Sequence, residues 1–347
     1  YRVPTMIRTL LSILFLLFPI TASAQLIDRI AFGSCVHQDK PQPIWSEVLV
    51  ADPDLFIFLG DNIYGDSDDP AVLAAKYEQL AAKPGFQQLI ASTEVIATWD
   101  DHDYGQNDIG ANYIAKEASR KLMLDFFDEP GDSERRTQAG GIYTSYLYTD
   151  NDKSLQIILL DLRWNRTALT EIADPVVLEE REAQQRGPYE ASLAADARLL
   201  GEYQWQWLEE QMQVPADVRI IGSSIQLLAE FTGWETWANY PKDRQRFFEL
   251  LAEYQREPIL IISGDVHWAE LSEINTTNND WPLIELTSSG LTEEWSEISP
   301  NRHRVGPAFA EANFGLIEID WTQMPPALDL EIRSEAGDTL ISRGLRF

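Results

Sequence analysis

The sequence predicts a layered α/β protein, and three observations lead to this prediction. Residues 55–59 form an unbroken apolar run that ends at Gly60, which is typical of a strand buried on both faces. Similar apolar runs alternate with segments of helical periodicity through Trp99, which gives a β-α-β rhythm. Several of these runs end directly in Asp or His. Open α/β sheets bind their ligands at the carboxyl ends of strands, so the fold prediction also predicts where a site would lie.

The first residues are predicted to be a leader outside the folded domain. The apolar run from Leu10 to Ile20 is too short to span a bilayer, and Ala22-Ser23-Ala24 fits a small-residue cleavage site. We therefore expect residues 1–24 to contain a few upstream residues and a signal peptide cleaved near Ala24, which would make the protein secreted or periplasmic. The alternative is an uncleaved membrane anchor. Residues 25–347 contain no linker and no further membrane-spanning run, and we expect them to form one domain.

The predicted elements follow one another as short apolar or alternating runs and as amphipathic segments. Strands are expected at residues 30–34, 55–59, 94–99, 140–148, 155–160, 218–221, 259–263, 282–287, 314–320, 327–332 and 339–343. Helices are expected at residues 43–51, 70–82, 116–127, 202–212 and 243–254. The last four strands should complete a second sheet. Residues 164–199 are polar and acidic, and we expect a surface excursion without a clear strand near the mouth of the site.

Charge restricts the possible partners. The chain has 56 Asp and Glu against 27 Lys and Arg, for a formal net charge of −29. Such a surface repels phosphate backbones, so we expect no stable nucleic-acid binding. The simplest account of this charge is solubility. A non-catalytic acidic extracellular calcium-binding protein is an alternative, although the only Asp-rich loop of that kind is Asp66-Ser67-Asp68-Asp69.

Residues that can bind metal follow the predicted strands. Cys35 is the single cysteine, and in an exported protein it is either a reactive or metal-bound thiol or a small buried hydrophobe. Two-metal hydrolases share one carboxylate between two cations about 3.5 to 4 Å apart, and Asp61 is our choice for that bridge. Cys35 and Tyr64 would bind one ion, since a thiolate and a phenolate need a strongly acidic cation such as iron. Asp101 would bind a second ion, for which calcium, manganese or zinc is suitable.

Histidines complete the expected site. Asp265 and His267 are one residue apart, so on an extended strand both would point toward the cations. His102 is either a ligand or the acid that protonates the leaving oxygen. Whether Asp100 also binds metal stays open. Trp234, Trp237 and Tyr240 either stack in the core or form a wall that faces substrate.

Five motifs in order carry a resemblance to a known family. They are Phe32-Gly33-Ser34-Cys35, Gly60-Asp61-Asn62-Ile63-Tyr64-Gly65-Asp66, Trp99-Asp100-Asp101-His102-Asp103, Leu160-Asp161-Leu162-Arg163 and Ser263-Gly264-Asp265-Val266-His267. This set resembles PhoD-like alkaline phosphatases and phosphodiesterases, a branch of the calcineurin-like metallophosphoesterases. The resemblance spans about residues 30–320, and residues 164–199 have no counterpart that we can place.

The resemblance implies a four-layer αββα sandwich with two mixed sheets and a site of Fe³⁺ and Ca²⁺, with Mn²⁺ or Zn²⁺ possible in the second position. Carried over by motif, the metal ligands are Cys35, Asp61, Tyr64, Asp101, Asp265 and His267. A hydroxide between the metals would attack phosphorus, since a strong Lewis acid lowers the pKa of water to about 7. Asn107 or Arg163 would hold a phosphate oxygen, and His102 would protonate the leaving group.

The expected function is therefore that of a metal-dependent phosphoric ester hydrolase, acting on small-molecule or lipid phosphate esters. Phosphodiesterase, alkaline phosphomonoesterase and phospholipase-type activity are not separated by the sequence. A secreted esterase that cleaves another bond would need a Gly-x-Ser-x-Gly elbow, and the sequence contains none. The sequence does not indicate an oligomeric state.

Overall fold

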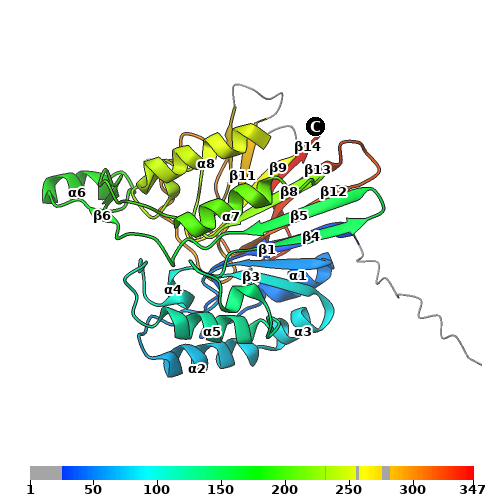
Figure 1. Cartoon of the computed structure of the whole chain (residues 1–347), viewed down its shortest axis with the longest axis horizontal. Helices are drawn as coiled ribbons and strands as arrows, with labels where there is room; N and C mark the ends of the chain where they lie inside the picture. Colours follow the sequence, from blue (N-terminus) through cyan, green and yellow to red (C-terminus); the bar gives the residue numbers. More distant parts are fainter. Residues whose placement is uncertain (1–25, 231, 255–257, 276–281) are drawn as a thin grey trace, which may run out of the picture.

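The computed structural model describes residues 26–230, 232–254, 258–275 and 282–347, so the expected leader, residues 1–24, lies outside the described residues. Two six-stranded mixed sheets lie face to face between two layers of helices (Figure 1). This arrangement confirms the predicted α/β fold, an αββα sandwich. No helix within the described ranges has the length and apolar character needed to cross a membrane.

The first sheet has the strand order β14-β13-β12-β1-β2-β3. Its strands are β1 (Arg29–Gly33), β2 (Leu55–Leu59), β3 (Glu94–Thr98), β12 (Asn313–Asp320), β13 (Ala327–Ser334) and β14 (Thr339–Leu345). The strands β1, β2 and β3 are parallel, whereas β12 pairs with β1 in the antiparallel sense. The carboxyl ends of β1, β2 and β3 therefore lie at one edge of the sheet.

The second sheet has the strand order β10-β11-β9-β8-β5-β4. Its strands are β4 (Thr144–Asp150), β5 (Lys153–Leu159), β8 (Val218–Ser223), β9 (Ile259–Ser263), β10 (Ala269–Ile274) and β11 (Leu283–Ser288). The four central strands β5, β8, β9 and β11 are parallel, with antiparallel β4 and β10 at the two edges.

Helices cover the outer faces of both sheets (Figure 1). Below the first sheet lie α1 (Ile44–Ala51), α2 (Pro70–Ala81), α3 (Pro84–Ser92) and α5 (Lys116–Phe126), and the short helix α4 (Asp101–Tyr104) follows β3. Above the second sheet lie α7 (Glu202–Met212) and α8 (Pro241–Tyr254). The 3-10 turns are η1 (Glu134–Arg136) and η2 (Trp237–Asn239).

Three apolar layers hold the four structural layers together, and β2 shows how the sequence builds them. Leu55, Ile57 and Leu59 pack between the two sheets. Phe56 and Phe58, which alternate with them, pack against the helices below. A third cluster lies between the second sheet and α7 and α8. Because side chains of a strand alternate between its faces, a strand that is apolar at every position must be covered on both sides.

The structure corrects part of the predicted topology. Of the last four strands, only β11 belongs to the second sheet, whereas β12, β13 and β14 extend the first sheet. The expected strand at residues 140–148 begins only at Thr144, since Gly140 and Gly141 have φ values of 86° and 122° and form a turn. The helix α3 and the strand β10 were not predicted.

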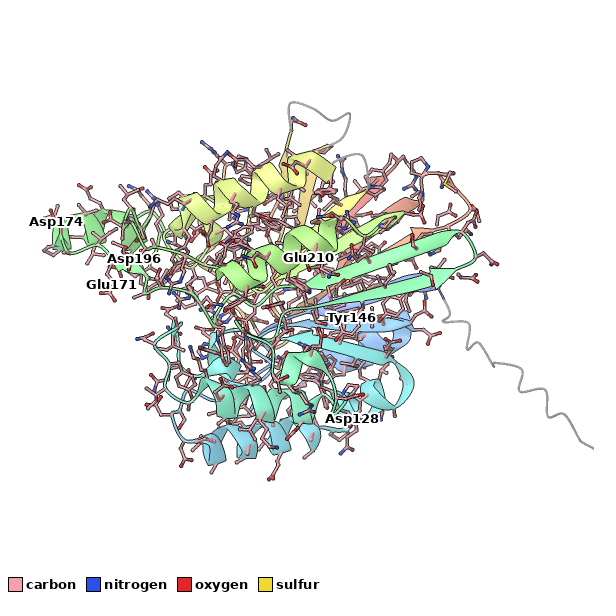
Figure 2. All side chains as sticks on the ribbon, in the orientation of Figure 1. Asp128, Tyr146, Glu171, Asp174, Asp196 and Glu210 are labelled. Carbon is pink, nitrogen blue, oxygen red and sulfur yellow. The ribbon has the colours of Figure 1, made fainter. Side chains whose placement is uncertain are left out.

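Residues 164–199 form a projection at one end of the molecule (Figure 1). It contains the short helix α6 (Pro175–Glu182) and a small two-stranded sheet of β6 (Thr170–Glu171) and β7 (Tyr189–Glu190), although no strand was expected there. Glu171, Asp174 and Asp196 are exposed on it, in agreement with its acidic composition (Figure 2).

Candidate metal centre

Strand ends from both sheets meet at one place. Cys35 follows β1, Asp61 follows β2, Asp101 follows β3, and Asp265 follows β9. Hydrogen bonds connect the strand ends of the two sheets here. The Asp265 backbone N–H donates to Ser34 Oγ at 3.3 Å, and Ser224 Oγ, after β8, donates to Asp100 Oδ1 at 2.6 Å. The expectation that these residues converge at the carboxyl ends of strands is thus met by the geometry.

The backbone at this edge has an unusual conformation. Cys35, Asp61, Asp265 and His267 have positive φ values of 64°, 50°, 74° and 61°. Such residues cost about 1 to 3 kcal/mol each and concentrate at functional sites. The expected extended geometry for Asp265 and His267 is wrong, because β9 ends at Ser263 and both residues lie in the loop that follows.

Gly60, at the end of β2, allows the end of this strand to lie close to the end of β3. Gly60 has a φ of +106°, and a Cβ at this position would lie 2.5 Å from the Cβ of Asp100. Only glycine can occupy this position without displacing the segment that carries Asp100 and Asp101.

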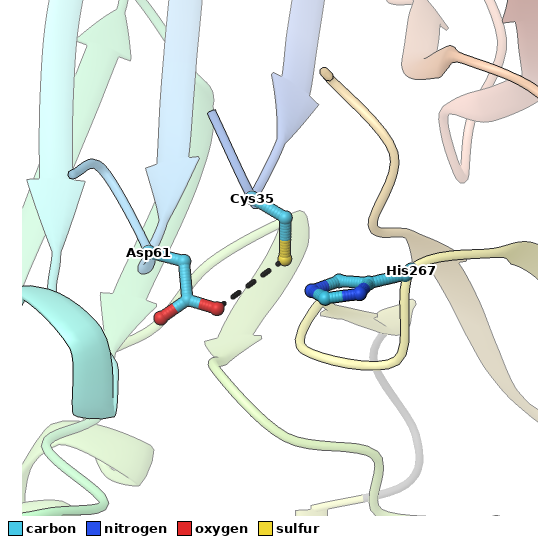
Figure 3. Close-up of side chains that lie close together, drawn as sticks. All are labelled: Cys35, Asp61 and His267. Carbon is cyan, nitrogen blue, oxygen red and sulfur yellow. Dashed lines mark hydrogen bonds between the residues drawn. The ribbon is translucent and has the colours of Figure 1, made fainter. Parts of the chain in front are cut away.

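A group with a thiol lies on one side of the site (Figure 3). The ligand atoms of Cys35, Asp61 and His267 all lie within 4.8 Å of one another. The Cys35 thiol donates to Asp61 Oδ2 at 3.4 Å, and the Tyr64 hydroxyl lies 3.0 Å from His267 Nε2. Burial raises the pKa of the Cys35 thiol to about 12, and it also raises the pKa of Tyr64. A cation bound here would have to displace protons from both groups.

A group of carboxylates lies beside the thiol group. Asp61, Asp100, Asp101 and Asp265 have carboxylate oxygens within 4.8 Å of one another. Burial, together with the charges of neighbouring carboxylates, raises the pKa values of Asp61 and Asp265 well above that of an ordinary aspartate. Ionised carboxylates at this separation repel one another unless a cation lies between them. The donor set therefore fits a metal ion.

Asp61 belongs to three of the groups that could bind a metal ion. The third of these contains Asp61, Asp101 and His102. A further group without Asp61 contains Asp101, Asp108 and Glu235. The bridging role expected for Asp61 stays a prediction, and these overlapping groups are the geometry on which it rests.

The pKa values of the two histidines at the site, His267 and His102, are shifted in opposite directions. Burial lowers the pKa of His267 to about 4, so this imidazole is neutral and can act as a ligand. Burial alone would also lower the pKa of His102, but the charges of Asp101 and Asp66 outweigh it and raise the value to about 9. His102 Nδ1 lies 2.7 Å from Asp66 Oδ1. His102 thus carries a proton at neutral pH.

Arg163 lies behind the site rather than in it. Its side chain is fully buried, and its guanidinium pairs with Asp100 at 2.5 Å and with Glu235 at 2.6 Å. Arg166 pairs with the other oxygen of Glu235 at 3.0 Å. The expected contact between Arg163 and substrate does not agree with this burial, because Arg163 is not among the residues that line the pocket. Arg163 instead fixes the positions of acidic residues at the site.

A pocket of about 180 Å³ opens beside the metal-binding groups. Its lining includes His102 and Asn107, which is exposed, as the sequence analysis expected for residues that contact substrate. Trp234 lines the pocket, whereas Trp237 and Tyr240 are buried in the core against α7 and α8. Core packing, one of the two expected roles, is thus confirmed for Trp237 and Tyr240, and a wall that faces substrate stays a prediction for Trp234.

Sequence reasoning missed several residues at the site. Ser289 Oγ lies 3.2 Å from the Cys35 sulfur and accepts the His267 backbone N–H at 2.8 Å. Ser289 could have been predicted as a site residue, because it directly follows β11, another parallel strand that ends at this edge. Asp108, Glu235 and Trp295 line the pocket from loops, where no strand marks them.

Comparisons with known proteins agree with this geometry. The family model described as PhoD-like phosphatase matches residues 30–314. No curated protein sequence matches the chain. A structure of PhoD superposes with a TM-score of 0.66 at 15% identity, covering 93% of this chain and 72% of that one. GAP50, the anchor in the inner membrane complex of Plasmodium, superposes with a TM-score of 0.58 at 12% identity, covering 93% of this chain and 90% of that one. At these identities, the two structures show a shared fold.

Proposed function

The chain belongs to the PhoD-like phosphatase family and is a metal-dependent phosphoesterase, and on that premise we propose that it hydrolyses phosphoric esters at a two-cation site centred on Asp61. The observation that carries this proposal is the membership of Asp61 in three overlapping ligand groups. When bound, the cations supply Lewis acidity and a hydroxide nucleophile near neutral pH.

We assign one cation to Cys35, Asp61, Tyr64 and His267. A thiol, a phenol and a carboxylate together favour a strongly acidic ion, and ferric iron is our choice. The second cation would be held by Asp61, Asp101 and Asp265, whose oxygen ligands suit calcium. Manganese or zinc would also accept these ligands.

The remaining residues act on the substrate or on the ligands. The charges of Asp101 and Asp66 raise the pKa of His102 in the metal-free protein, and in its protonated form His102 would give its proton to the departing ester oxygen. Asn107 is exposed at the pocket and would hold a non-bridging phosphate oxygen. Arg163 positions Asp100 without touching substrate. The predicted leader supports export from the cytoplasm, with residues 25–347 as one PhoD-like domain.

The test is hydrolysis of 4-nitrophenyl phosphodiesters and 4-nitrophenyl phosphate by metal-loaded protein. Asp61→Asn keeps the size of the side chain but removes its charge, and it should abolish turnover and lower the bound metal content. Asp196→Asn, on the exposed projection, is the matched control and should retain both (Figure 2). Turnover and metal content that both survive Asp61→Asn would refute the proposal.

A further inference from the structure

The pocket beside the metal-binding groups is lined by two chemically different sets of side chains. The polar set, which we call the polar side, includes Asp61, Asp101 and His102. The apolar set, which we call the apolar side, consists of Trp234, Val266, Trp268 and Trp295. A compact phosphate group bound at the cations would leave this apolar side in contact with water.

Trp234 and Trp295 form the accessible part of the apolar side. Their ring centroids are 6.0 Å apart, with an angle of 76° between the planes. Trp295 is 41% exposed and Trp234 is half-buried, so both have surface that a ligand could cover. Trp268 also lines the pocket but is only 2% exposed, so it offers a ligand far less surface. The Trp295 backbone N–H donates to the His267 carbonyl oxygen at 3.0 Å, which connects this ring to a candidate metal ligand.

The projection at residues 164–199 holds Trp234 in position. A Cβ at Gly187 would lie 2.4 Å from Cδ2 of Trp234, so the ring packs directly on the backbone of this glycine. The backbone N–H of Gly187 donates to the Thr232 carbonyl oxygen at 2.9 Å, and that of Tyr189 donates to the Gly233 carbonyl oxygen at 2.7 Å. These bonds fix the chain on the amino-terminal side of Trp234.

The same projection also reaches the polar side of the pocket. The Tyr189 hydroxyl donates a hydrogen bond to the carboxylate of Asp108, which lines the pocket. One segment therefore contacts both sides of the pocket, which gives it a direct route to substrate selection.

The lining offers little to balance the second charge of a compact dianion. Among the described residues that line the pocket, none is Lys or Arg, and the lining residue Glu235 already pairs with Arg163 and Arg166 behind the pocket. A phosphomonoester carries close to two negative charges at neutral pH, and a phosphodiester carries one. The lining thus provides no Lys or Arg to pair with the second charge of a monoester, whereas its apolar side chains add a favourable contact for the second ester group of a diester.

We propose that Trp234 and Trp295 form an aromatic wall that selects phosphodiesters whose second ester group is aromatic or apolar. This inference rests on the proposed function of the site. Water would add to phosphorus and the leaving alkoxide or phenoxide would depart, so the product is a phosphomonoester that keeps the group on the wall.

The test compares phenyl 4-nitrophenyl phosphate with methyl 4-nitrophenyl phosphate, using the full metal-loaded chain. Both release the same nitrophenolate, so they differ only in the group that would contact the wall. We expect kcat/KM to favour the phenyl ester by about tenfold, which corresponds to about 1.4 kcal/mol. Trp295→Ala should reduce this preference to about twofold or less. Any difference in intrinsic reactivity of the two esters cancels when the variant is compared with the wild type.

Two further variants define the wall. Gly187→Ala places a methyl group against the Trp234 ring and should also reduce the preference. Tyr203→Ala removes an aromatic side chain that is 66% exposed on α7 and should leave the preference unchanged. A preference that is absent in the wild type, or that survives Trp295→Ala, would overturn the wall.

A binding measurement separates this inference from the proposed function. Diphenyl phosphate and dimethyl phosphate are titrated into the protein, and quenching of tryptophan fluorescence is recorded. If neither the nitrophenyl diesters nor 4-nitrophenyl phosphate is hydrolysed, the proposed function fails, and the wall is then judged by binding alone. About tenfold tighter binding of diphenyl phosphate that is lost in Trp295→Ala supports the wall, whereas equal binding of the two ligands refutes it.

Discussion

The Cys35 thiol lies 3.4 Å from the Asp61 carboxylate, although the two residues follow different strands of the first sheet. The pairing of β1 with β2 in the parallel sense places both residues at the same edge, and the positive φ of each turns its side chain into the site. A thiol and a carboxylate on neighbouring strand ends thus form a pair of candidate ligands of different hardness.

Replacing the thiol should remove the ion that we assign to Cys35. Cys35→Ser keeps a small polar side chain but lacks the polarizable sulfur, so we expect loss of the iron and of any visible absorption from thiolate or phenolate coordinated to it. Turnover should fall by about 100-fold or more. Metal analysis and a visible spectrum check this, and a variant that keeps both iron and colour contradicts the assignment.

Metal loading should release protons. Burial raises the pKa values of Cys35 and Tyr64, and burial with neighbouring carboxylates raises that of Asp61, so the metal-free protein holds protons that a cation must displace. The apparent affinity for metal should therefore fall as the pH falls. Calorimetric titration in buffers of different ionisation enthalpy counts the released protons. A heat of metal binding that is the same in all buffers would show that Cys35, Tyr64 and Asp61 were already ionised before the metal bound.

The sequence predicted which candidate ligands would lie close together, because a buried strand that ends in Asp or His is a local signal. It singled out Cys35, Asp61 and His267, whose ligand atoms the structure brings within 4.8 Å of one another. It did not predict the sheet to which β12 belongs, since strand pairing depends on contacts between residues far apart in the chain. A long apolar or alternating run shows which faces of a strand are buried. It does not show which other strand pairs with it.

The roles of charged residues were less predictable than their positions. Arg163 follows a strand in the same way as the ligands do, yet it is fully buried and paired with Asp100 and Glu235. Glu235 lies in a loop far along the chain, so no local pattern revealed that it neutralises Arg163. Trp295 was missed for the same reason, because loop residues acquire their function from the elements on which they pack.

The role of His102 as an acid predicts a dependence on the leaving group. His102→Gln removes the proton donor, so hydrolysis of an alkyl diester with a poor leaving group should slow by about 100-fold or more. A nitrophenyl diester needs little protonation and should slow far less. Equal losses for both substrates would instead indicate that His102 binds metal.

The pH profile gives an independent test of the same role. His102 has a pKa of about 9 in the metal-free protein, and nearby cations would lower it. The acid is present below this pKa and is lost as the pH rises through it, so kcat/KM for the alkyl diester should fall on the alkaline side, at or below pH 9. The alkaline fall should be absent in His102→Gln and present in the wild type.

The buried position of Arg163 predicts a large effect on stability. Arg163→Met removes a positive charge from between Asp100 and Glu235 and leaves two buried carboxylates without this partner, which should cost about 3 to 5 kcal/mol. Arg346→Met is the matched control, because Arg346 pairs with Asp329 at the surface, where both side chains are 52% exposed and the pair contributes about 0 to 1 kcal/mol. Urea unfolding of the metal-free proteins measures both values. If Arg163→Met unfolds at the same urea concentration as the control, the guanidinium is not needed to hold the acidic residues in place. A direct contact between Arg163 and substrate would then again have to be considered.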